Sequence, residues 1–331
     1  MTMPTYDHPV NCADIFAARK RIADKIRRTP VVPSPSLSER FGSQVQLKLE
    51  HLQNTGSFKL RGASNAIACL SDEQKACGVV GVSTGNHGRG LAAAARAAGV
   101  HAIVCMSALV PQNKIDGIRS YGAEVRIVGR SQEDAQLEVD RLVTEQGMTE
   151  LAPFDDPNVI AGQGTLGLEI LEDVPDLETL VVQVSGGGLM SGVACAIKTN
   201  KPDVRVIGVC MERGAGMHAS LQAGKPVVIE ELSTLADSLG GGIGANNRCT
   251  FPMVRDLMDE SILLSEAEIA AGIHHAYWQE RQIVEGSGAV GIAAMLAGKI
   301  DQVGNTVVLI SGGNIAMDLH HRIIDGEVPE V

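Results

Sequence analysis

The amine of Lys59 stands in a sequence context that could make it a nucleophile. Lys59 belongs to the stretch Ser57-Phe58-Lys59-Leu60-Arg61-Gly62-Ala63, in which Ser57 has a side chain suited to cap a helix start. Apolar residues then recur on one side of the predicted helix, at Ala63, Ala66, Ile67 and Leu70. In the first helical turn, the helix dipole and apolar neighbours disfavour the charged form, and burial can lower a lysine pKa by ~3–5 units. The neutral amine that Schiff-base chemistry needs would result, whereas a solvated first-turn lysine is the alternative.

A glycine-rich turn could bind a phosphate group. Ser185-Gly186-Gly187-Gly188-Leu189 stands between a predicted strand at 180–184 and a predicted helix that runs through Lys198. Consecutive backbone N–H groups at such a helix start can face an anion. A dinucleotide site is a rival, because Glu212 follows the next strand where a ribose-binding carboxylate would lie. However, Ser191 stands where that motif needs its third glycine. A purely structural turn is the third interpretation.

Two further polar stretches follow predicted strands. Ser83-Thr84-Gly85-Asn86-His87-Gly88 comes after the strand at 78–82, and Ser311-Gly312-Gly313-Asn314 comes after the strand at 306–310. The first stretch could bind a carboxylate at a helix N-terminus, although an isolated histidine such as His87 is more often structural. The second stretch could be no more than a glycine turn.

The elements that would position these stretches alternate between strand and helix. Predicted strands cover 45–50, 78–82, 102–106, 124–128, 180–184, 204–210 and 306–310. Besides the helix that begins near Lys59, predicted helices cover 12–27, 91–98, 114–121, 131–146, 266–279 and 289–297. Such alternation predicts right-handed crossovers and a parallel, doubly wound α/β architecture.

Taken together and in this order, the four polar stretches resemble the fold-type II enzymes that depend on pyridoxal 5'-phosphate (PLP), the tryptophan synthase β-like class. The chain is most similar to the serine/threonine dehydratase and serine racemase branch, from about 28 to 314. The resemblance implies two doubly wound parallel-sheet domains and a homodimer. A discontinuous large PLP-binding domain would comprise 1–55 and 150–331, and a small substrate-side domain would comprise 56–149.

The resemblance also implies roles for individual residues. Lys59 would hold PLP as a Schiff base and, once freed, remove the α-proton of the substrate. Phe58 would pack against the cofactor ring, Asn86 would face its ring oxygen and Ser311 its pyridine nitrogen. The phosphate would lie against Ser185, Gly186, Gly187, Gly188 and Leu189. The substrate would contact Ser83, Thr84, Gly85, His87 and Arg89, and Thr84 stands where the racemases carry a catalytic serine.

The implied reaction is removal of water and ammonia from a β-hydroxy-α-amino acid. Arg89 follows the His87-Gly88 pair, where related enzymes that act on serine or threonine commonly carry a neutral glutamine. If Arg89 faces the pocket, its guanidinium could bind a second carboxylate, which favours 3-hydroxyaspartate as in a hydroxyaspartate ammonia-lyase. The alternatives are a serine or threonine dehydratase, a serine racemase, β-replacement as in cysteine synthases, and an NAD-binding protein.

No metal ion is expected from the sequence. Where the family places a glutamate and an aspartate for a divalent cation, this chain has Cys210 and Gly216, and a hard cation prefers carboxylates. Glu212 and His218 repeat the same spacing two residues later and are the less favoured substitutes.

Composition limits the classes of binding partner and the cellular compartment that we expect for this protein. The 28 Lys and Arg against 39 Asp and Glu give a net charge of −11, which argues against nucleic acid or an acidic membrane surface. The 7 cysteines are scattered and odd in number, which favours a reducing compartment. The N-terminus lacks a signal pattern, and no apolar run approaches the ~20 residues needed to span a membrane. We therefore expect a cytoplasmic enzyme of a small hydroxy amino acid.

Overall fold

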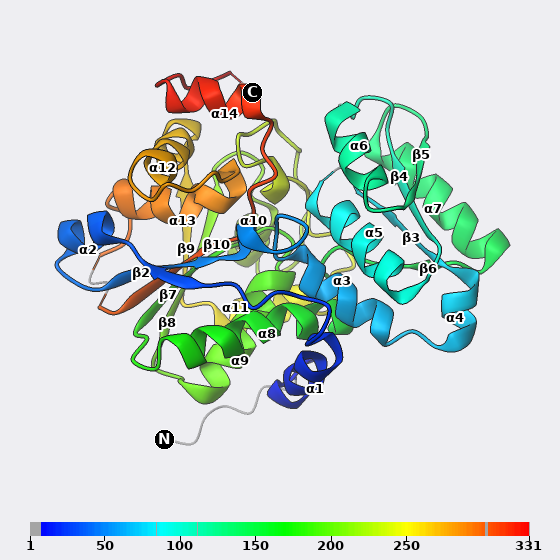
Figure 1. Cartoon of the computed structure of the whole chain (residues 1–331), viewed down its shortest axis with the longest axis horizontal. Coiled ribbons are helices and arrows are strands. Elements are labelled where there is room, and N and C mark those ends of the chain that lie inside the picture. The colour runs from blue at the N-terminus through cyan, green and yellow to red at the C-terminus, as the bar shows by residue number, and fades with distance from the viewer. Residues whose placement is uncertain (1–7, 84, 111, 302–303, 331) are drawn as a thin grey trace.

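The chain folds around two β-sheets, as a computed structural model shows (Figure 1). The structure describes residues 8–83, 85–110, 112–301 and 304–330. In Figure 1 the six-stranded sheet and its helices fill the left and centre, the four-stranded sheet lies on the right, and helix α3 (Lys59–Ala68) lies between them. Among the described residues, no helix has both the length and the apolar character needed to cross a membrane.

The six-stranded sheet combines strands from both ends of the chain. Its order is β1 (Val31–Pro33), β2 (Val45–Leu49), β10 (Thr306–Ile310), β7 (Thr179–Gln183), β8 (Arg205–Met211) and β9 (Glu260–Leu264). The strands run parallel except at one edge, where β1 pairs antiparallel with β2. The expectation of parallel sheets is therefore confirmed for this sheet with the exception of β1. Strand β1 is too short for an alternation of apolar and polar side chains to be recognised in the sequence.

Helices cover both faces of the six-stranded sheet. Adjacent strand residues point to opposite faces, so that Val181 belongs to one hydrophobic core and Val182 to the other. The core that contains Val181 is closed by α2 (Pro35–Phe41), α12 (Glu266–Trp278), α13 (Gly286–Leu296) and α14 (Met317–Ile324). The core that contains Val182 is closed by α1 (Cys12–Ile22), α8 (Pro157–Asp173), α9 (Gly188–Asn200), α10 (Gly216–Ala223) and α11 (Thr250–Leu257).

The four-stranded sheet is parallel throughout. Its order is β5 (Glu124–Ile127), β4 (Ala102–Met106), β3 (Val79–Val82) and β6 (Thr149–Glu150). Helices α3, α5 (Asn86–Ala98) and α6 (Gln112–Arg119) pack on one face, and α7 (Gln132–Gln146) packs on the other. The remaining short elements are η1 (Glu50–Leu52), α4 (Asp72–Cys77) and η2 (Asp237–Leu239).

Several predicted elements need correction. Helix α1 ends at Ile22 and not at Arg27, and α3 begins with Phe58 as its N-cap, so the prediction that Ser57 caps this helix is wrong. Ser57 instead forms an isolated antiparallel bridge with Gly312, which keeps its backbone extended. The division into two domains stays a prediction, because sheet membership alone does not set domain boundaries.

Three strands end where the predicted polar stretches begin. Strand β3 ends at Val82, β7 at Gln183 and β10 at Ile310, and each leads directly into one of the stretches. Ligands of open parallel sheets bind outside the carboxyl ends of the strands. The topology therefore brings together residues that are far apart in the sequence.

Candidate active site

Two connected pockets lie at these strand ends, and both contain Lys59. The inner pocket is lined by Phe58, Lys59, Asn86, Phe154, Gln183, residues 185–189, residues 238–239, Glu285, Ser287 and Ser311. The outer pocket is lined by Lys59, Val82, Ser83, residues 85–87, Lys114, residues 153–154, Ser185, residues 231–234, residues 237–238 and residues 240–242. The two pockets share Lys59, Asn86, Phe154, Ser185 and Ser238, so they adjoin each other.

Backbone hydrogen bonds connect the residues just before Lys59 to the loop that follows β10. The Phe58 N–H donates to the Ser311 carbonyl oxygen at 3.1 Å, and the Gly313 N–H donates to the Gly56 carbonyl oxygen at 3.0 Å. Gly56 has a φ of 76°, which favours glycine at this tight approach. The first residue of α3 is consequently held beside Ser311.

The amine of Lys59 has the properties that the sequence predicts. The side chain is half-buried, and Nζ donates to the Pro153 carbonyl oxygen at 2.8 Å and lies 5.4 Å from the centre of the Phe58 ring. Removal of the ammonium from water lowers the pKa of Lys59 to about 8. About a tenth of the Lys59 amine is thus neutral at roughly pH 7, against less than a thousandth for an ordinary lysine, and Lys59 lines the inner pocket.

The glycine turn presents backbone donors to the same pocket. Gly187 has a φ of 90°, which other residues rarely adopt, and a Cβ on Gly186 would collide with the Phe154 ring. Helix α9 begins at Gly188, and the first N–H groups of a helix have no partner within it. The partial positive charge of this helix end favours an anion.

Buried polar atoms in the inner pocket lack protein partners. Gln183 Oε1 and Ser287 Oγ are buried and make no hydrogen bond to the described residues. Ser311 is buried, and its hydroxyl donates to the Ser287 carbonyl oxygen at a long 3.5 Å. Unsatisfied buried groups usually indicate a missing partner, so the residues present fit a polar, phosphorylated ligand with an aldehyde that Lys59 can reach.

Asn86 forms a buried pair with a glutamate that was not among the predicted site residues. Asn86 begins α5, and its Nδ2 donates to Glu285 Oε1 at 2.6 Å. Burial, together with the charge of Asp237, raises the pKa of Glu285 to about 7. Glu285 lines the inner pocket, and the sequence analysis names no motif that contains it.

The predicted substrate loop lies at the outer pocket. Ser83 Oγ accepts hydrogen bonds from the Gly85 N–H at 3.2 Å and the Gly88 N–H at 2.8 Å. His87 Nε2 donates to the Leu151 carbonyl oxygen at 2.9 Å, and burial lowers its pKa to about 3, so this ring is neutral. Thr84 lies outside the described residues.

The guanidinium of Arg89 makes a protein contact. Nη1 donates to Asn314 Oδ1 at 3.1 Å, and Arg89 is not among the described residues that line either pocket. A loop that the sequence analysis did not assign to the site contributes instead, from Glu231 to Gly242. Within it, Asp237 pairs with Lys114 at 2.7 Å and so joins this loop to α6.

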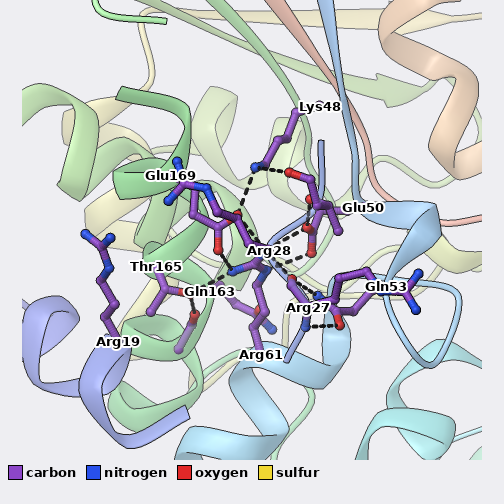
Figure 2. Close-up of polar contacts among 12 residues, drawn as sticks. Arg19, Arg27, Arg28, Lys48, Glu50, Gln53, Arg61, Gln163, Thr165 and Glu169 are labelled. Carbon is purple, nitrogen blue, oxygen red and sulfur yellow. Dashed lines mark hydrogen bonds and ion pairs between the residues drawn. The ribbon is translucent and has the colours of Figure 1, made fainter. Parts of the chain in front are cut away.

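A buried ion network is centred on Arg61 (Figure 2). The guanidinium of Arg61 is fully buried and contacts two carboxylates, Glu50 at 2.8 Å and Glu169 at 2.7 Å. Lys48 is also fully buried and donates to Glu169 at 2.8 Å. Burial alone would raise the pKa of Glu50, but the charge and hydrogen bonds of Arg61 outweigh it and hold that pKa below its ordinary value. The network joins β2, η1 and α8 to α3 two residues after Lys59, and no motif in the sequence indicates it.

The candidate metal positions do not converge. Burial raises the pKa of Cys210 to about 12, so its thiol stays protonated, and Gly216 has no side chain. Glu212 is exposed, whereas His218 Nδ1 lies 2.9 Å from Ser261 Oγ. Within the part of the chain that the structure describes, no three His, Cys, Asp or Glu side chains form a metal-binding group.

Comparisons with known proteins point to one family. The family model described as pyridoxal-phosphate dependent enzyme matches residues 22–312. A protein of Sinorhizobium fredii provisionally named a threonine dehydratase is 57% identical over 95% of both chains. The L-threonine ammonia-lyase of Thermotoga maritima is 43% identical over 96% of this chain and 78% of its own. The solved structure of maize serine racemase has a TM-score of 0.91 at 34% identity and covers 95% of this chain and 97% of its own.

Proposed function

The chain belongs to the family of pyridoxal-phosphate dependent enzymes, and from this premise we propose that it dehydrates and deaminates threonine or serine. It is a PLP-dependent ammonia-lyase of the dehydratase type, with the fold-type II architecture that the sequence predicts. One observation carries the proposal: the amine of Lys59 has a lowered pKa and lies in the same pocket as the glycine turn at the start of α9.

Residues of the inner pocket would hold the cofactor. Lys59 would bind its aldehyde, the backbone N–H groups of 185–189 would receive its phosphate, and Phe58 would pack against its ring. Ser311 would face the pyridine nitrogen and Asn86 the ring oxygen. When bound, the cofactor supplies an electron sink that weakens the bonds to the α-carbon of the substrate.

The chain itself would supply binding and proton transfer. The substrate carboxylate would bind at the N-terminus of α5, where Ser83, Gly85 and backbone N–H groups face the outer pocket. His87 is neutral and would orient the loop through Leu151, without adding charge. Lys59 would take the α-proton, a role that an amine with a pKa of about 8 can perform near neutral pH.

The placement of Arg89 supports the choice of threonine or serine as substrate. The preference for 3-hydroxyaspartate requires a guanidinium in the pocket, and the hydrogen bond to Asn314 directs it elsewhere. The names of the relatives also favour a neutral hydroxy amino acid. We therefore favour threonine or serine, the alternative that the sequence left open.

A substrate panel tests this choice. The ratio kcat/KM should be highest for threonine or serine and lower for 3-hydroxyaspartate when ammonia release is measured on the purified enzyme. A clear preference for 3-hydroxyaspartate would contradict the choice, and ammonia release that needs an added thiol would indicate β-replacement.

The expected homodimer and cytoplasmic location stay predictions.

The rate at which cofactor rebinds to cofactor-free enzyme should level off near pH 8. The aldehyde reacts with the neutral amine, and burial lowers the pKa of Lys59 from 10.5 to about 8. The neutral fraction should therefore rise only about tenfold between roughly pH 7 and pH 9, whereas an ordinary lysine amine would gain about a hundredfold. The growth of absorbance near ~410 nm after mixing measures the rate, with a lysine analogue as control. A rate that climbs without levelling off would show an ordinary lysine.

Prolonged treatment with a chelator should leave ammonia release unchanged. Cys210 and Gly216 lack the carboxylate oxygens that magnesium or calcium prefers. The measurement is the rate on threonine before and after treatment, with the treated enzyme plus magnesium as control. A large loss that magnesium or manganese restores would mean that Glu212, His218 or other groups form a site.

A further inference from the structure

A chain of four polar side chains runs from Arg89 to the inner pocket. Arg89 Nη1 donates to Asn314 Oδ1 at 3.1 Å, and Asn314 Nδ2 donates to Asn86 Oδ1 at 2.6 Å. Asn86 Nδ2 in turn donates to Glu285 Oε1 at 2.6 Å. Asn86 and Glu285 both line the inner pocket. The chain thus connects a cation outside the pocket with two polar groups inside it.

The chemistry of the end groups fixes the direction of every hydrogen bond. A guanidinium can only donate, so Asn314 must turn its carbonyl oxygen toward Arg89 and its amide nitrogen toward Asn86. Asn86 must then accept with Oδ1 and direct Nδ2 toward Glu285. The Thr55 carbonyl oxygen, which accepts from Asn314 Nδ2 at 2.9 Å, requires the same orientation.

We propose that Arg89 is a positioning residue, which fixes the orientation of the Asn86 amide through Asn314 and so directs its donor into the cofactor site. The inference rests on the proposed function insofar as that places Asn86 beside the cofactor. A neutral glutamine at position 89 could donate or accept, and would leave the orientation of Asn314 to its contacts with Thr55 and Asn86. Because hydrogen bonds from charged donors are stronger than neutral ones, the arginine also polarises the chain more strongly.

The structure offers a second way to disturb this chain without changing Arg89. Gly117 in α6 has no side chain, and a Cβ built there would collide with the guanidinium of Arg89. The terminal atoms of arginine can move aside, which would shift the guanidinium from its position against Asn314. Alanine is also favoured over glycine within a helix, so Gly117→Ala should leave α6 intact.

The test compares Arg89→Met, Arg89→Lys and Gly117→Ala with the unaltered protein. The readouts are the affinity for cofactor, the position of its absorbance maximum, and kcat/KM for threonine, serine and 3-hydroxyaspartate. Arg89→Met and Gly117→Ala should each weaken cofactor binding about tenfold, as expected when the Asn86 amide no longer directs its donor to the cofactor. Both variants should shift the absorbance maximum in the same direction. Arg89→Lys should recover part of the affinity. Arg96→Met removes an exposed arginine of α5, the helix that also contains Arg89. This variant should change neither the cofactor affinity nor the absorbance maximum.

The outcomes separate this inference from the proposed function. Unchanged cofactor affinity and absorbance in Arg89→Met, or in Gly117→Ala, would overturn it. A loss confined to 3-hydroxyaspartate would also overturn it and would return Arg89 to substrate binding. Because affinity and absorbance are measured without turnover, they remain informative even if the enzyme releases no ammonia from threonine.

Discussion

Replacement of Lys59 with alanine is expected to remove the absorbance near ~410 nm and to lower ammonia release by several orders of magnitude. The amine of Lys59 is the nucleophile that the inner pocket presents to a bound aldehyde, and its pKa of about 8 suits it to proton transfer as well. One substitution would therefore remove both the covalent attachment of the cofactor and the base. Absorbance of the purified variant and its rate on threonine measure the two losses separately.

Two controls accompany this experiment. Lys20→Ala removes an exposed lysine of α1, far from the pocket residues in the sequence, and should leave absorbance and rate unchanged. Urea unfolding of both variants without cofactor should show that Lys59→Ala remains folded. Near-normal ammonia release by a folded Lys59→Ala protein would refute the assignment of this lysine.

Arg61→Met is expected to lower the free energy of unfolding by about 3–5 kcal/mol. The substitution leaves Glu50 and Glu169 in the interior without the guanidinium that binds both, and an uncompensated buried carboxylate is costly. Lys48 still reaches Glu169, so Glu50 should be the more strongly affected of the two. Urea unfolding of the cofactor-free protein gives the difference directly.

Arg141 provides a matched control on the surface. Its guanidinium also contacts two carboxylates, Glu138 and Glu145, but its side chain is 42% exposed. Since exposed ion pairs contribute about 0–1 kcal/mol, Arg141→Met should have little effect. Arg61→Lys should lie between the two, because an ammonium keeps the charge but cannot bind both carboxylates as a planar fork. Equal destabilisation by Arg61→Met and Arg141→Met would contradict the importance of the network.

The positions of the chemical groups could be predicted because they follow from strand ends. The loops after Gln183 and Ile310 leave neighbouring parallel strands of the six-stranded sheet at their carboxyl ends, so polar residues there lie close together. The loop after Val82 leaves the carboxyl end of a strand in the four-stranded sheet, so its position next to the other two depends on how the two sheets pack. Short apolar runs identified these strands, and the resemblance supplied the order of the motifs. The cofactor and the type of reaction followed without knowledge of any contact.

Helix α8 could not be predicted, and neither could the network that depends on it. Residues 159–170 are buried on all sides, so no alternation of apolar and polar positions marks the helix. Its glycines oppose helix formation in isolation but permit close packing, since a Cβ on Gly162 would lie 2.6 Å from the Arg61 carbonyl oxygen. The pairing of Arg61 with Glu169 joins residues 108 apart in the sequence, which no local pattern can indicate.

The placement of Arg89 shows a second limit. Its sequence position, one turn into α5 beside a carboxylate-binding loop, fits a substrate ligand as well as a structural donor. Only the position of Asn314, which belongs to the loop after β10, distinguishes the two. Side-chain direction within a helical turn depends on such distant partners.

Reduction of the enzyme with borohydride, followed by peptide mapping, tests the central claim most directly. Reduction makes the bond between cofactor and lysine permanent, so the modified peptide identifies the lysine that carries it. We expect modification of Lys59, in the peptide that contains Phe58 and Leu60. Lys114 is the other lysine that lines the outer pocket among the described residues. Modification of Lys114 with Lys59 unmodified would show that Lys59 is not the lysine that holds the cofactor.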